Sequence, residues 1–337
     1  MNTVATLPER LKKIAETHKA LKEEIGKVIV GQEEVIDQVL IAILARGHCL
    51  LLGVPGLAKT LLVRCLGEVL DLQFNRVQFT PDLMPSDITG TEILDEESGS
   101  SHRSLRFVKG PVFTNLLLAD EINRTPPKTQ AALLEAMQEN YVTTGGKTFA
   151  IPQPFFVLAT QNPIEQEGTY PLPEAQLDRF MFLVRMSYPQ RSEEIQILRQ
   201  TTANRDVKLS RLIDGAAILE LQRCVRDIPV SEHVLAYCID LVRMTRPTEP
   251  GAPDFVKANL TFGAGPRAGQ YLVLAAKAWA ALEGRLNVSC ADVRRNAHSV
   301  LSHRIACNFH AAGDGIDATQ IIDRLLKFVP EPDSSGV

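Results

Sequence analysis

Residues 53–60 read Gly53-Val54-Pro55-Gly56-Leu57-Ala58-Lys59-Thr60, and they follow an apolar run at 49–52 that is typical of a buried strand. The glycines let the backbone turn tightly, so that successive amides point inward at phosphate groups. Lys59 would reach the β- and γ-phosphates, and the Thr60 hydroxyl would hold Mg²⁺. Residues 61–70 are typical of a helix, whose N-terminal end adds its dipole to this anion site. The stretch therefore predicts a phosphate-binding loop between a strand and a helix.

Ala58 departs from the usual pattern of such a loop, G-x-x-x-x-G-K-[ST], which has glycine at that position. A methyl group fits there if the residue has a negative φ, so the departure does not remove the predicted site. The alternative interpretation of the stretch is an ordinary Gly/Pro turn that joins a strand to a helix.

Composition limits the possible classes of protein. The chain has 337 residues, 45% of them hydrophobic and 23% charged, which is typical of a globular protein of about two domains. The net charge of −4 provides no general attraction to nucleic acid or to an acidic membrane surface, although a local basic patch stays possible. No apolar run approaches the roughly 20 residues of a membrane span, and the first ten residues lack a signal-peptide core, so we expect a cytoplasmic protein. Six scattered cysteines predict buried free thiols, with no disulfide or metal site, at positions 49, 65, 224, 238, 290 and 307.

The chain divides into segments of different hydrophobic periodicity. Residues 1–26 contain an amphipathic helix over 7–24. Residues 27–189 alternate helices at 33–45, 59–70 and 127–139 with strands at 48–53, 74–79, 115–119, 155–160 and 180–186, which predicts a parallel sheet covered by helices. Residues 190–330 predict a second, helical domain with helices at 192–204, 215–226, 231–245, 265–283, 290–304 and 316–328, and 331–337 predict a disordered tail.

Two hairpins interrupt the α/β pattern. The segment 91–110 has strand-like runs on either side of Gly99-Ser100-Ser101, and the segment 141–151 has them on either side of Gly145-Gly146. A Gly-Gly pair between alternating runs indicates a two-residue hairpin turn. Taken alone, both hairpins could be surface decorations.

Polar side chains follow two of the predicted strands. Asp120 and Glu121 come directly after an apolar strand, and Asn162 follows the next one. Parallel strands bring their carboxyl ends to the same edge of a sheet, which is where ligands bind. There Asp120 would order Mg²⁺ through its water shell, and Glu121 would polarise a water molecule for attack on the γ-phosphate. Asn162 could bond that water or the γ-phosphate, or it could simply form a turn before Pro163.

Five motifs in this order resemble the MoxR family of AAA+ ATPases over about residues 25–310; they lie at 53–60, 120–124, 159–163, 172–180 and 265–268. The resemblance implies an α/β P-loop AAA+ core with a parallel sheet and a C-terminal all-helical lid. It also implies an ATPase that binds ATP and Mg²⁺, through Thr60 and Asp120, and assembles into a ring, usually a hexamer, with ATP at the subunit interfaces.

The resemblance also implies roles for particular residues. Asn162 matches sensor 1, Arg267 matches the sensor 2 arginine of the lid, and Arg179 matches the arginine finger that reaches a neighbouring subunit's nucleotide. The hairpins resemble a helix-2 insert and a pre-sensor-1 hairpin, which face the pore of the ring. The expected nucleotide contacts are Gly31, Gln32, Gly53, Pro55, Gly56, Leu57, Ala58, Lys59, Thr60, Leu61 and Asp120.

The three arginines have simpler interpretations as well. Pro266 would start a helix and point Arg267 at the phosphates, or Arg267 could be a solvated surface residue. Arg179 could pair with Asp178 or with Glu174. Arg124 is the second candidate for a trans-acting arginine, although a structural salt bridge is its simpler role.

The function that we expect is ATP-driven remodelling or assembly of a client protein, beside a partner with a von Willebrand factor A domain. A nucleic-acid motor of the same clade is an alternative, but the hairpins carry few cations beyond Arg103, Arg106 and Lys147. A P-loop kinase is another alternative, and it would have no use for an interface arginine or for Glu121. Insertion of a metal into a client, as in magnesium-chelatase-like ATPases, stays open.

Overall fold

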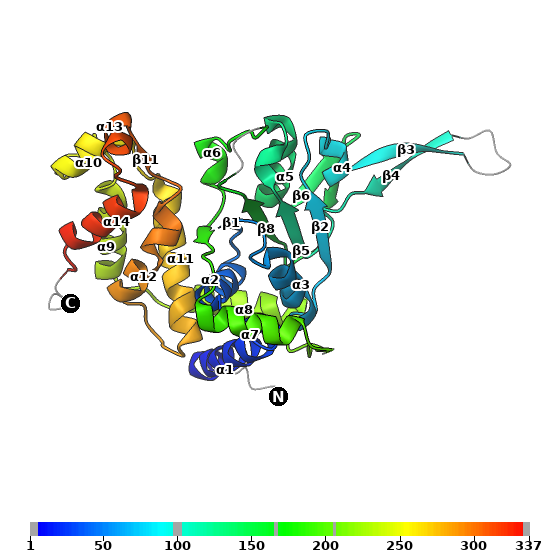
Figure 1. Ribbon diagram of the computed structural model, residues 1–337, viewed down its shortest axis with the longest axis horizontal. Helices are drawn as coiled ribbons and strands as arrows, with labels where there is room; N and C mark the ends of the chain where they lie inside the picture. Colours follow the sequence, from blue (N-terminus) through cyan, green and yellow to red (C-terminus); the bar gives the residue numbers. More distant parts are fainter. Residues whose placement is uncertain (1–5, 97–102, 165–167, 205–206, 333–337) are drawn as a thin grey trace.

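The computed structural model describes residues 6–96, 103–164, 168–204 and 207–332. An α/β core occupies the middle of the molecule, a group of carboxyl-terminal helices lies on one side, and a long hairpin projects from the other side (Figure 1). The chain thus has the predicted α/β core and helical lid.

The core is a five-stranded parallel sheet in the order β2-β5-β8-β1-β9. Its strands are β1 (Cys49–Leu52), β2 (Phe74–Gln78), β5 (Leu116–Asp120), β8 (Phe156–Gln161) and β9 (Phe182–Arg185). Each lies within or next to a range predicted from the sequence. Because all five run in the same direction, the segments that follow them meet at one edge, which we call the carboxyl edge. The segments that precede them meet at the opposite, amino edge, where the Met181 amide donates to the His48 carbonyl at 2.8 Å.

Helices cover both faces of the sheet, so the strands are buried on both sides and read as continuous apolar runs. In β5, Leu116 and Leu118 belong to a hydrophobic cluster with α2 (Glu33–Leu44) and α3 (Lys59–Val69), whereas Leu117 and Ala119 belong to a second cluster with α5 (Pro127–Glu139). Successive strand residues point to opposite faces, which explains this division.

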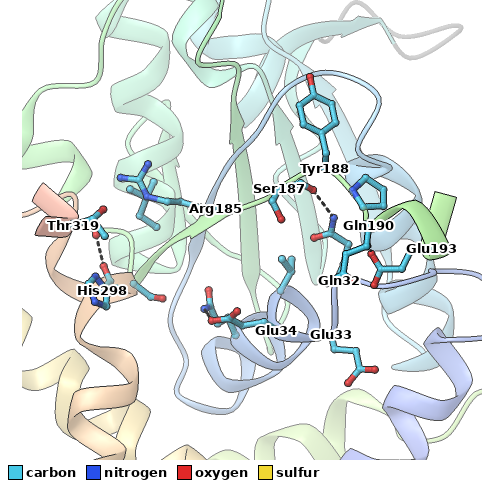
Figure 2. Close-up of a pocket in the computed structure, with 16 residues that line it drawn as sticks. Gln32, Glu33, Glu34, Arg185, Ser187, Tyr188, Gln190, Glu193, His298 and Thr319 are labelled. Atoms are coloured by element: carbon cyan, nitrogen blue, oxygen red, sulfur yellow. Dashed lines mark hydrogen bonds between the residues drawn. The ribbon is translucent and has the colours of Figure 1, made fainter. Parts of the chain in front are cut away.

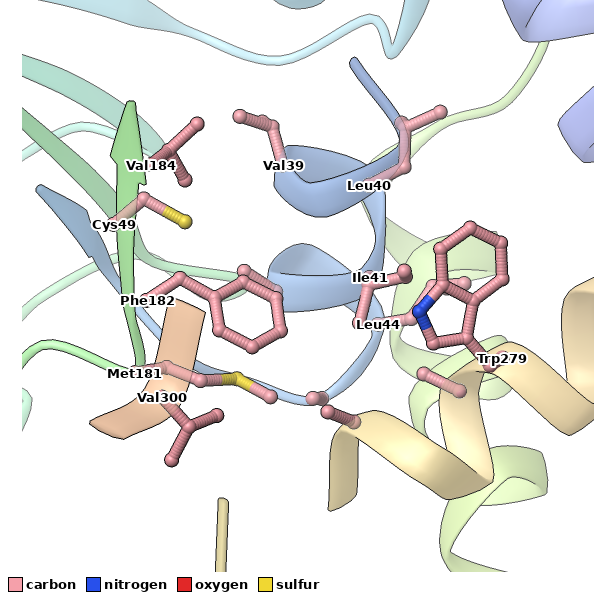
Figure 3. Close-up of a cluster of buried hydrophobic side chains, with 14 of the residues drawn as sticks. Val39, Leu40, Ile41, Leu44, Cys49, Met181, Phe182, Val184, Trp279 and Val300 are labelled. Atoms are coloured by element: carbon pink, nitrogen blue, oxygen red, sulfur yellow. The ribbon is translucent and has the colours of Figure 1, made fainter. Parts of the chain in front are cut away.

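The first of these clusters continues from the sheet into the carboxyl-terminal helices. Figure 3 shows α2 between the sheet and the lid, with Phe182 of β9 on one side and Trp279 of α11 on the other. Apolar packing therefore crosses the domain boundary predicted near residue 190. The helices involved are α1 (Leu7–Ile25), α8 (Gly215–Asp227), α9 (Glu232–Arg243), α11 (Pro266–Leu282), α12 (Cys290–Leu301) and α14 (Ala318–Phe328).

The remaining elements are mostly short. The helix α7 (Arg191–Thr201) was predicted from its periodicity. The sequence pattern did not reveal α4 (Pro85–Thr89), the 3-10 turn η1 (Ile122–Arg124), α6 (Glu174–Leu177), α10 (Asp254–Asn259), α13 (Phe309–Gly313), or the strands β10 (Leu260–Phe262) and β11 (Ala306–Cys307), which pair within the lid. Elements of two to six residues are too short to show a period. The helix predicted over 290–304 ends earlier, at Leu301.

Both predicted hairpins are present. One consists of β3 (Gly90–Glu96) and β4 (Arg103–Lys109), and its predicted turn at 99–101 lies outside the described residues. The other consists of β6 (Tyr141–Thr144) and β7 (Lys147–Ala150), joined by Gly145-Gly146, both with positive φ. Phe107 of β4 stacks on Phe149 of β7 with their ring centroids 4.2 Å apart. The two hairpins therefore contact each other.

The remaining composition-based predictions concern thiols, metals and membranes. All six cysteines are free thiols, and five of them are buried. In the described parts of the chain, no cluster of three or more His, Cys, Asp or Glu side chains is arranged to hold a metal ion. No helix there has the length and apolar character needed to cross a bilayer. Of the predicted tail, residues 333–337 lie outside the described residues.

Candidate nucleotide-binding site

The loop at 53–58 joins β1 to α3 at the carboxyl edge of the sheet. Gly56 has a φ of +87°, and a Cβ atom built there would meet open space. Ala58 does not meet the condition of a negative φ, because its φ is +56° and its ψ is +26°. The chain must reverse immediately before the first residue of α3, and a left-handed residue achieves this turn. An alanine in that conformation costs roughly 1–2 kcal/mol relative to the right-handed one.

Lys59 opens α3, and its ammonium group donates to the carbonyl of Gly53 in the same loop. Partial burial lowers the pKa of Lys59, while the negative charges of Asp120 and Glu121 oppose that shift. The ammonium group therefore lies within electrostatic reach of both carboxylates. Thr60, the next residue, is exposed on the first turn of the helix.

Side chains from the neighbouring strands hold the two acidic residues. Thr160 of β8 donates to Asp120 Oδ1 at 2.6 Å, and its hydroxyl oxygen accepts the Glu121 amide at 2.8 Å. Gln78 of β2 donates to Glu121 Oε2 at 2.8 Å, and Arg76 donates to Asp120 Oδ2 at 2.7 Å. Both carboxylates are thus fixed by the sheet. The roles of Arg76, Gln78 and Thr160 were not predicted. Arg76 and Gln78 belong to no motif, Thr160 lies in the motif at 159–163 without an assigned role, and only the strand register reveals what the three side chains do.

Glu121 has an unusual backbone and a second cationic neighbour. Its φ of +57° turns the chain sharply after β5. Arg124 donates to Glu121 Oε2 at 3.1 Å, which is the structural salt bridge expected for that arginine.

Asn162 lies beside the phosphate-binding loop. The preceding residue, Gln161, accepts the Gly53 amide at 3.3 Å, so β8 ends against the start of the loop. Asn162 is buried, and its Oδ1 accepts the amide of Ile164 at 3.1 Å, as in a turn-forming asparagine. The side-chain nitrogen of Asn162 takes no part in this hydrogen bond with Ile164.

Gln32 borders a hollow between the core and the lid (Figure 2). The hollow has a volume of about 480 Å³, within the range of small-molecule sites. Gln32 donates to the carbonyl of Ser187 at 3.0 Å, and Met186 packs against Gly53. The hollow is therefore connected to the phosphate-binding loop through Met186, which precedes the lining residue Ser187. The neighbouring Gly31, with a φ of +69°, leaves room for Glu193, since a Cβ there would lie 2.6 Å from Glu193 Oε1.

Arg179 and Arg267 lie at the amino edge of the sheet, away from the loop. Arg179 precedes β9, and Arg267 donates to Asp178 Oδ2 at 2.7 Å. Within one chain Arg267 therefore does not point at the phosphate-binding loop, and its expected place at nucleotide phosphates stays a prediction. The physical reason is that α11 packs on α2 and the first turn of α11 meets the segment before β9.

The guanidinium group of Arg179 has no carboxylate partner among the described residues. Asp178, which the alternative interpretation gave as a partner of Arg179, pairs with Arg267 and Arg304 instead. Arg179 is half-buried. The predicted site residues thus form two separate groups, one at each edge of the sheet.

The carboxyl-edge group fits a magnesium–nucleotide complex. The open space around Gly56 leaves room for phosphate groups beside the loop amides. Lys59 supplies a positive charge there. The hydroxyl of Thr60 and the carboxylate of Asp120 are oxygen ligands of the kind that Mg²⁺ prefers.

Comparisons with known proteins agree with this geometry. Residues 48–182 match the ATPase family associated with various cellular activities (AAA), and residues 255–325 match the AAA lid domain. The chain is 41% identical to the chaperone MoxR1 of Mycobacterium tuberculosis over 314 residues, which cover 93% of this chain and 82% of that protein. It is 30% identical to the protein MoxR of Methylorubrum extorquens over 331 residues, which cover 90% and 92%.

A solved structure is also similar. The crystal structure of a Cytophaga hutchinsonii protein proposed to be an ATPase superimposes with a TM-score of 0.89 at 42% sequence identity. The match covers 96% of this chain and 98% of that one.

Proposed function

Because this chain belongs to the MoxR family of AAA+ ATPases, we propose that it hydrolyses Mg-ATP in a ring whose subunits complete one another's active sites. One observation carries the proposal. Lys59, Asp120 and Glu121 lie at the carboxyl edge of the sheet, whereas Arg179 and Arg267 lie at its amino edge. A site that uses both groups has to draw them from two copies of the chain.

Within one subunit, the carboxyl-edge residues bind and orient the reactants. The loop amides and Lys59 hold the phosphates, and Thr60 and Asp120 would hold Mg²⁺, which supplies positive charge to the phosphates when it is bound. Glu121 accepts a proton from the attacking water. Its hydrogen bonds with Gln78 and Arg124 fix the direction of the carboxylate. Asn162 offers its side-chain amide to that water or to the γ-phosphate.

The neighbouring subunit contributes cations. Transfer of a phosphoryl group to water builds negative charge on the γ-phosphate oxygens, so positioned positive charges dominate the catalysis. Arg179 supplies such a charge in trans, and the lack of a carboxylate partner among the described residues leaves its charge available. Arg267 lies beside it and enters the same interface.

The purpose of the cycle is remodelling of a protein client. Support comes from the name of one relative, a chaperone, and from the hairpin β3–β4, on which Leu94 and Leu105 face each other at 54% and 62% exposure. Exposed apolar side chains on a projecting hairpin suit a polypeptide better than they suit a phosphate backbone. A hexameric ring and a partner with a von Willebrand factor A domain remain part of this proposal.

The test is the dependence of ATP hydrolysis on protein concentration. Turnover per subunit should rise steeply as the chain assembles, in parallel with the mass measured by light scattering. The variant Glu121→Gln should assemble with ATP and not hydrolyse it. Glu139→Gln, which removes the same charge from an exposed position on α5, should behave like the wild type. A turnover per subunit that stays constant down to the monomer would refute the shared site.

A further inference from the structure

The segment that carries Arg179 is attached to the lid by its backbone. Two lid side chains, Arg304 and Tyr271, donate to the carbonyl groups of residues 178–181, which lie between α6 and β9, and a third, His303, lies against one of these groups. Arg304 donates to the carbonyls of Asp178 at 2.8 Å, Met181 at 3.2 Å and Phe180; Tyr271 donates to that of Arg179 at 3.2 Å; and His303 Nε2 lies 3.0 Å from that of Phe180. Four consecutive carbonyl groups are thus held from the lid.

Arg304 is the centre of this arrangement. It follows α12, its side chain is only 1% exposed, and its Nε donates to Asp178 Oδ1 at 2.8 Å. Burial lowers the pKa of Arg304, and the charge of Asp178 opposes that shift. A buried guanidinium group is costly unless its donors are satisfied, and here they are satisfied mainly by one short segment. A lysine cannot reproduce the planar, forked set of donors.

Asp178 joins this arrangement to the second interface arginine. One carboxylate oxygen accepts from Arg304 and the other from Arg267, on the first turn of α11. Tyr271 lies one turn further along α11, and its ring is 5.0 Å from the Arg304 guanidinium carbon. Any rotation of the lid relative to the sheet therefore moves the backbone of residues 178–181 or breaks these bonds.

We propose that Arg304, assisted by Tyr271, is a positioning residue that lets the lid of one subunit set the place of Arg179 at the next subunit's nucleotide. The inference rests on the proposed function, in which Arg179 acts in trans. It adds a route by which the lid of one subunit controls hydrolysis in its neighbour. Arg304 itself touches no reacting atom.

The first test compares two tyrosines of the lid. Tyr271→Phe removes only the hydroxyl that bonds the Arg179 carbonyl. The matched control is Tyr237→Phe, which removes a hydroxyl of a buried lid tyrosine that accepts from Arg294 at 3.1 Å. We expect kcat to fall about 3- to 10-fold in Tyr271→Phe and at least tenfold in Arg304→Lys, with KM for ATP unchanged. Tyr237→Phe should keep kcat. Equal kcat values for the two tyrosine variants would overturn the proposal.

The second test mixes subunits. Arg304→Lys keeps an intact Glu121 but positions its finger poorly, whereas Glu121→Gln has a dead site and an intact finger. A mixture of the two should hydrolyse ATP faster than the sum of the separate preparations, because sites form between them. A mixture of Arg179→Ala with Glu121→Gln serves as the reference. If that reference recovers activity and the Arg304→Lys mixture does not, Arg304 acts inside its own subunit and the inference is wrong.

If the mixture of Arg179→Ala with Glu121→Gln also fails to recover ATP hydrolysis, the two subunits do not share a site. The proposed function then fails together with the inference. A double variant separates positioning from other effects. Arg304→Lys combined with Arg179→Ala should be no slower than Arg179→Ala alone, since Arg304 acts through Arg179. A further fall in kcat would show that Arg304 acts apart from Arg179 and would overturn the proposal.

Discussion

The two edges of the five-stranded sheet differ in what holds their functional side chains. At the carboxyl edge, Asp120 and Glu121 are bonded by Thr160 and Gln78, which belong to adjacent strands of the same sheet. At the amino edge, the segment that contains Arg179 is bonded by Arg304 and other side chains of the lid. Strands in one sheet keep a fixed register, whereas a lid packed on the sheet can rotate. Lid movement would therefore disturb the edge that carries Arg179, the half that the proposed function assigns to a neighbouring subunit, and would spare the edge that carries Asp120 and Glu121.

The largest effect is expected from removing the cation of the carboxyl edge. Lys59→Ala takes away the ammonium group beside the loop, and the loop amides alone then face the phosphates. Nucleotide binding should fall below detection in calorimetry at micromolar protein. Lys128→Ala, which removes an amine from the first turn of α5, is the control and should bind normally. Normal nucleotide binding by Lys59→Ala would show that the nucleotide does not bind at the carboxyl edge.

Removing the guanidinium group of Arg179, the proposed arginine finger, should greatly slow hydrolysis and leave nucleotide binding intact, whereas Lys59→Ala should abolish binding. Arg179→Ala keeps the whole carboxyl edge, so nucleotide affinity should match the wild type. Hydrolysis should fall by about 10³ or more, the range known for arginine fingers. Single-turnover kinetics and a binding titration on the same preparation separate the two quantities. Unchanged hydrolysis would transfer the role to Arg267, at the same edge, or to Arg124, at the carboxyl edge. A transfer to Arg124 would remove the distinction between the edges.

The sequence predicted the carboxyl edge better than the amino edge. Lys59, Asp120 and Glu121 follow apolar strands, and parallel strands place such residues together, so local patterns were sufficient. The residues that orient them, Thr160 and Gln78, could not be found because strand register is a property of the folded sheet. Arg267 was expected at the phosphates because a helix start was visible. Its position at the edge opposite the loop follows from the packing of that helix on α2, which the sequence does not reveal. The helix predicted over 290–304 included Arg304, so the sequence pattern did not indicate that its side chain bonds the segment 178–181.

The amino edge should also be more sensitive to acid. Burial lowers the pKa of His48 to about 4 and that of His303 well below its usual value. His48 Nδ1 accepts the amide of Val157 at 3.0 Å, which requires the neutral ring. Since its folded pKa is depressed, the stabilising contribution is present above pH 6.5 and is lost as the pH falls toward 4. For His48 this loss amounts to about 3 kcal/mol of unfolding free energy.

Urea denaturation at several pH values between 7 and 4 measures this loss. His48→Gln should be less stable at pH 7 and should lose less stability on acidification than the wild type. His310→Gln, at an exposed position, should follow the wild-type curve. An unchanged pH dependence in His48→Gln would show that the acid sensitivity lies elsewhere.

The smallest effect concerns backbone conformation, in which the two edges also differ. Three residues other than glycine that were expected at the nucleotide, Gln32, Ala58 and Glu121, have a left-handed backbone, and neither Arg179 nor Arg267 has one. Ala58→Gly removes the cost of a Cβ in that conformation but adds freedom to the unfolded chain. We expect a net gain of about 0.5 kcal/mol in unfolding free energy, from the difference of those two terms, with unchanged hydrolysis.

The control for Ala58→Gly is Ala131→Gly, the same chemical change at an exposed, ordinary helical position in α5. It should destabilise the protein by about 1 kcal/mol. Because the two changes are chemically identical, opposite signs in chemical denaturation can come only from the backbone conformation at residue 58. A loss of stability in both variants would mean that the loop relaxes to a right-handed Ala58. The backbone contrast between the two edges would then rest on Gln32 and Glu121.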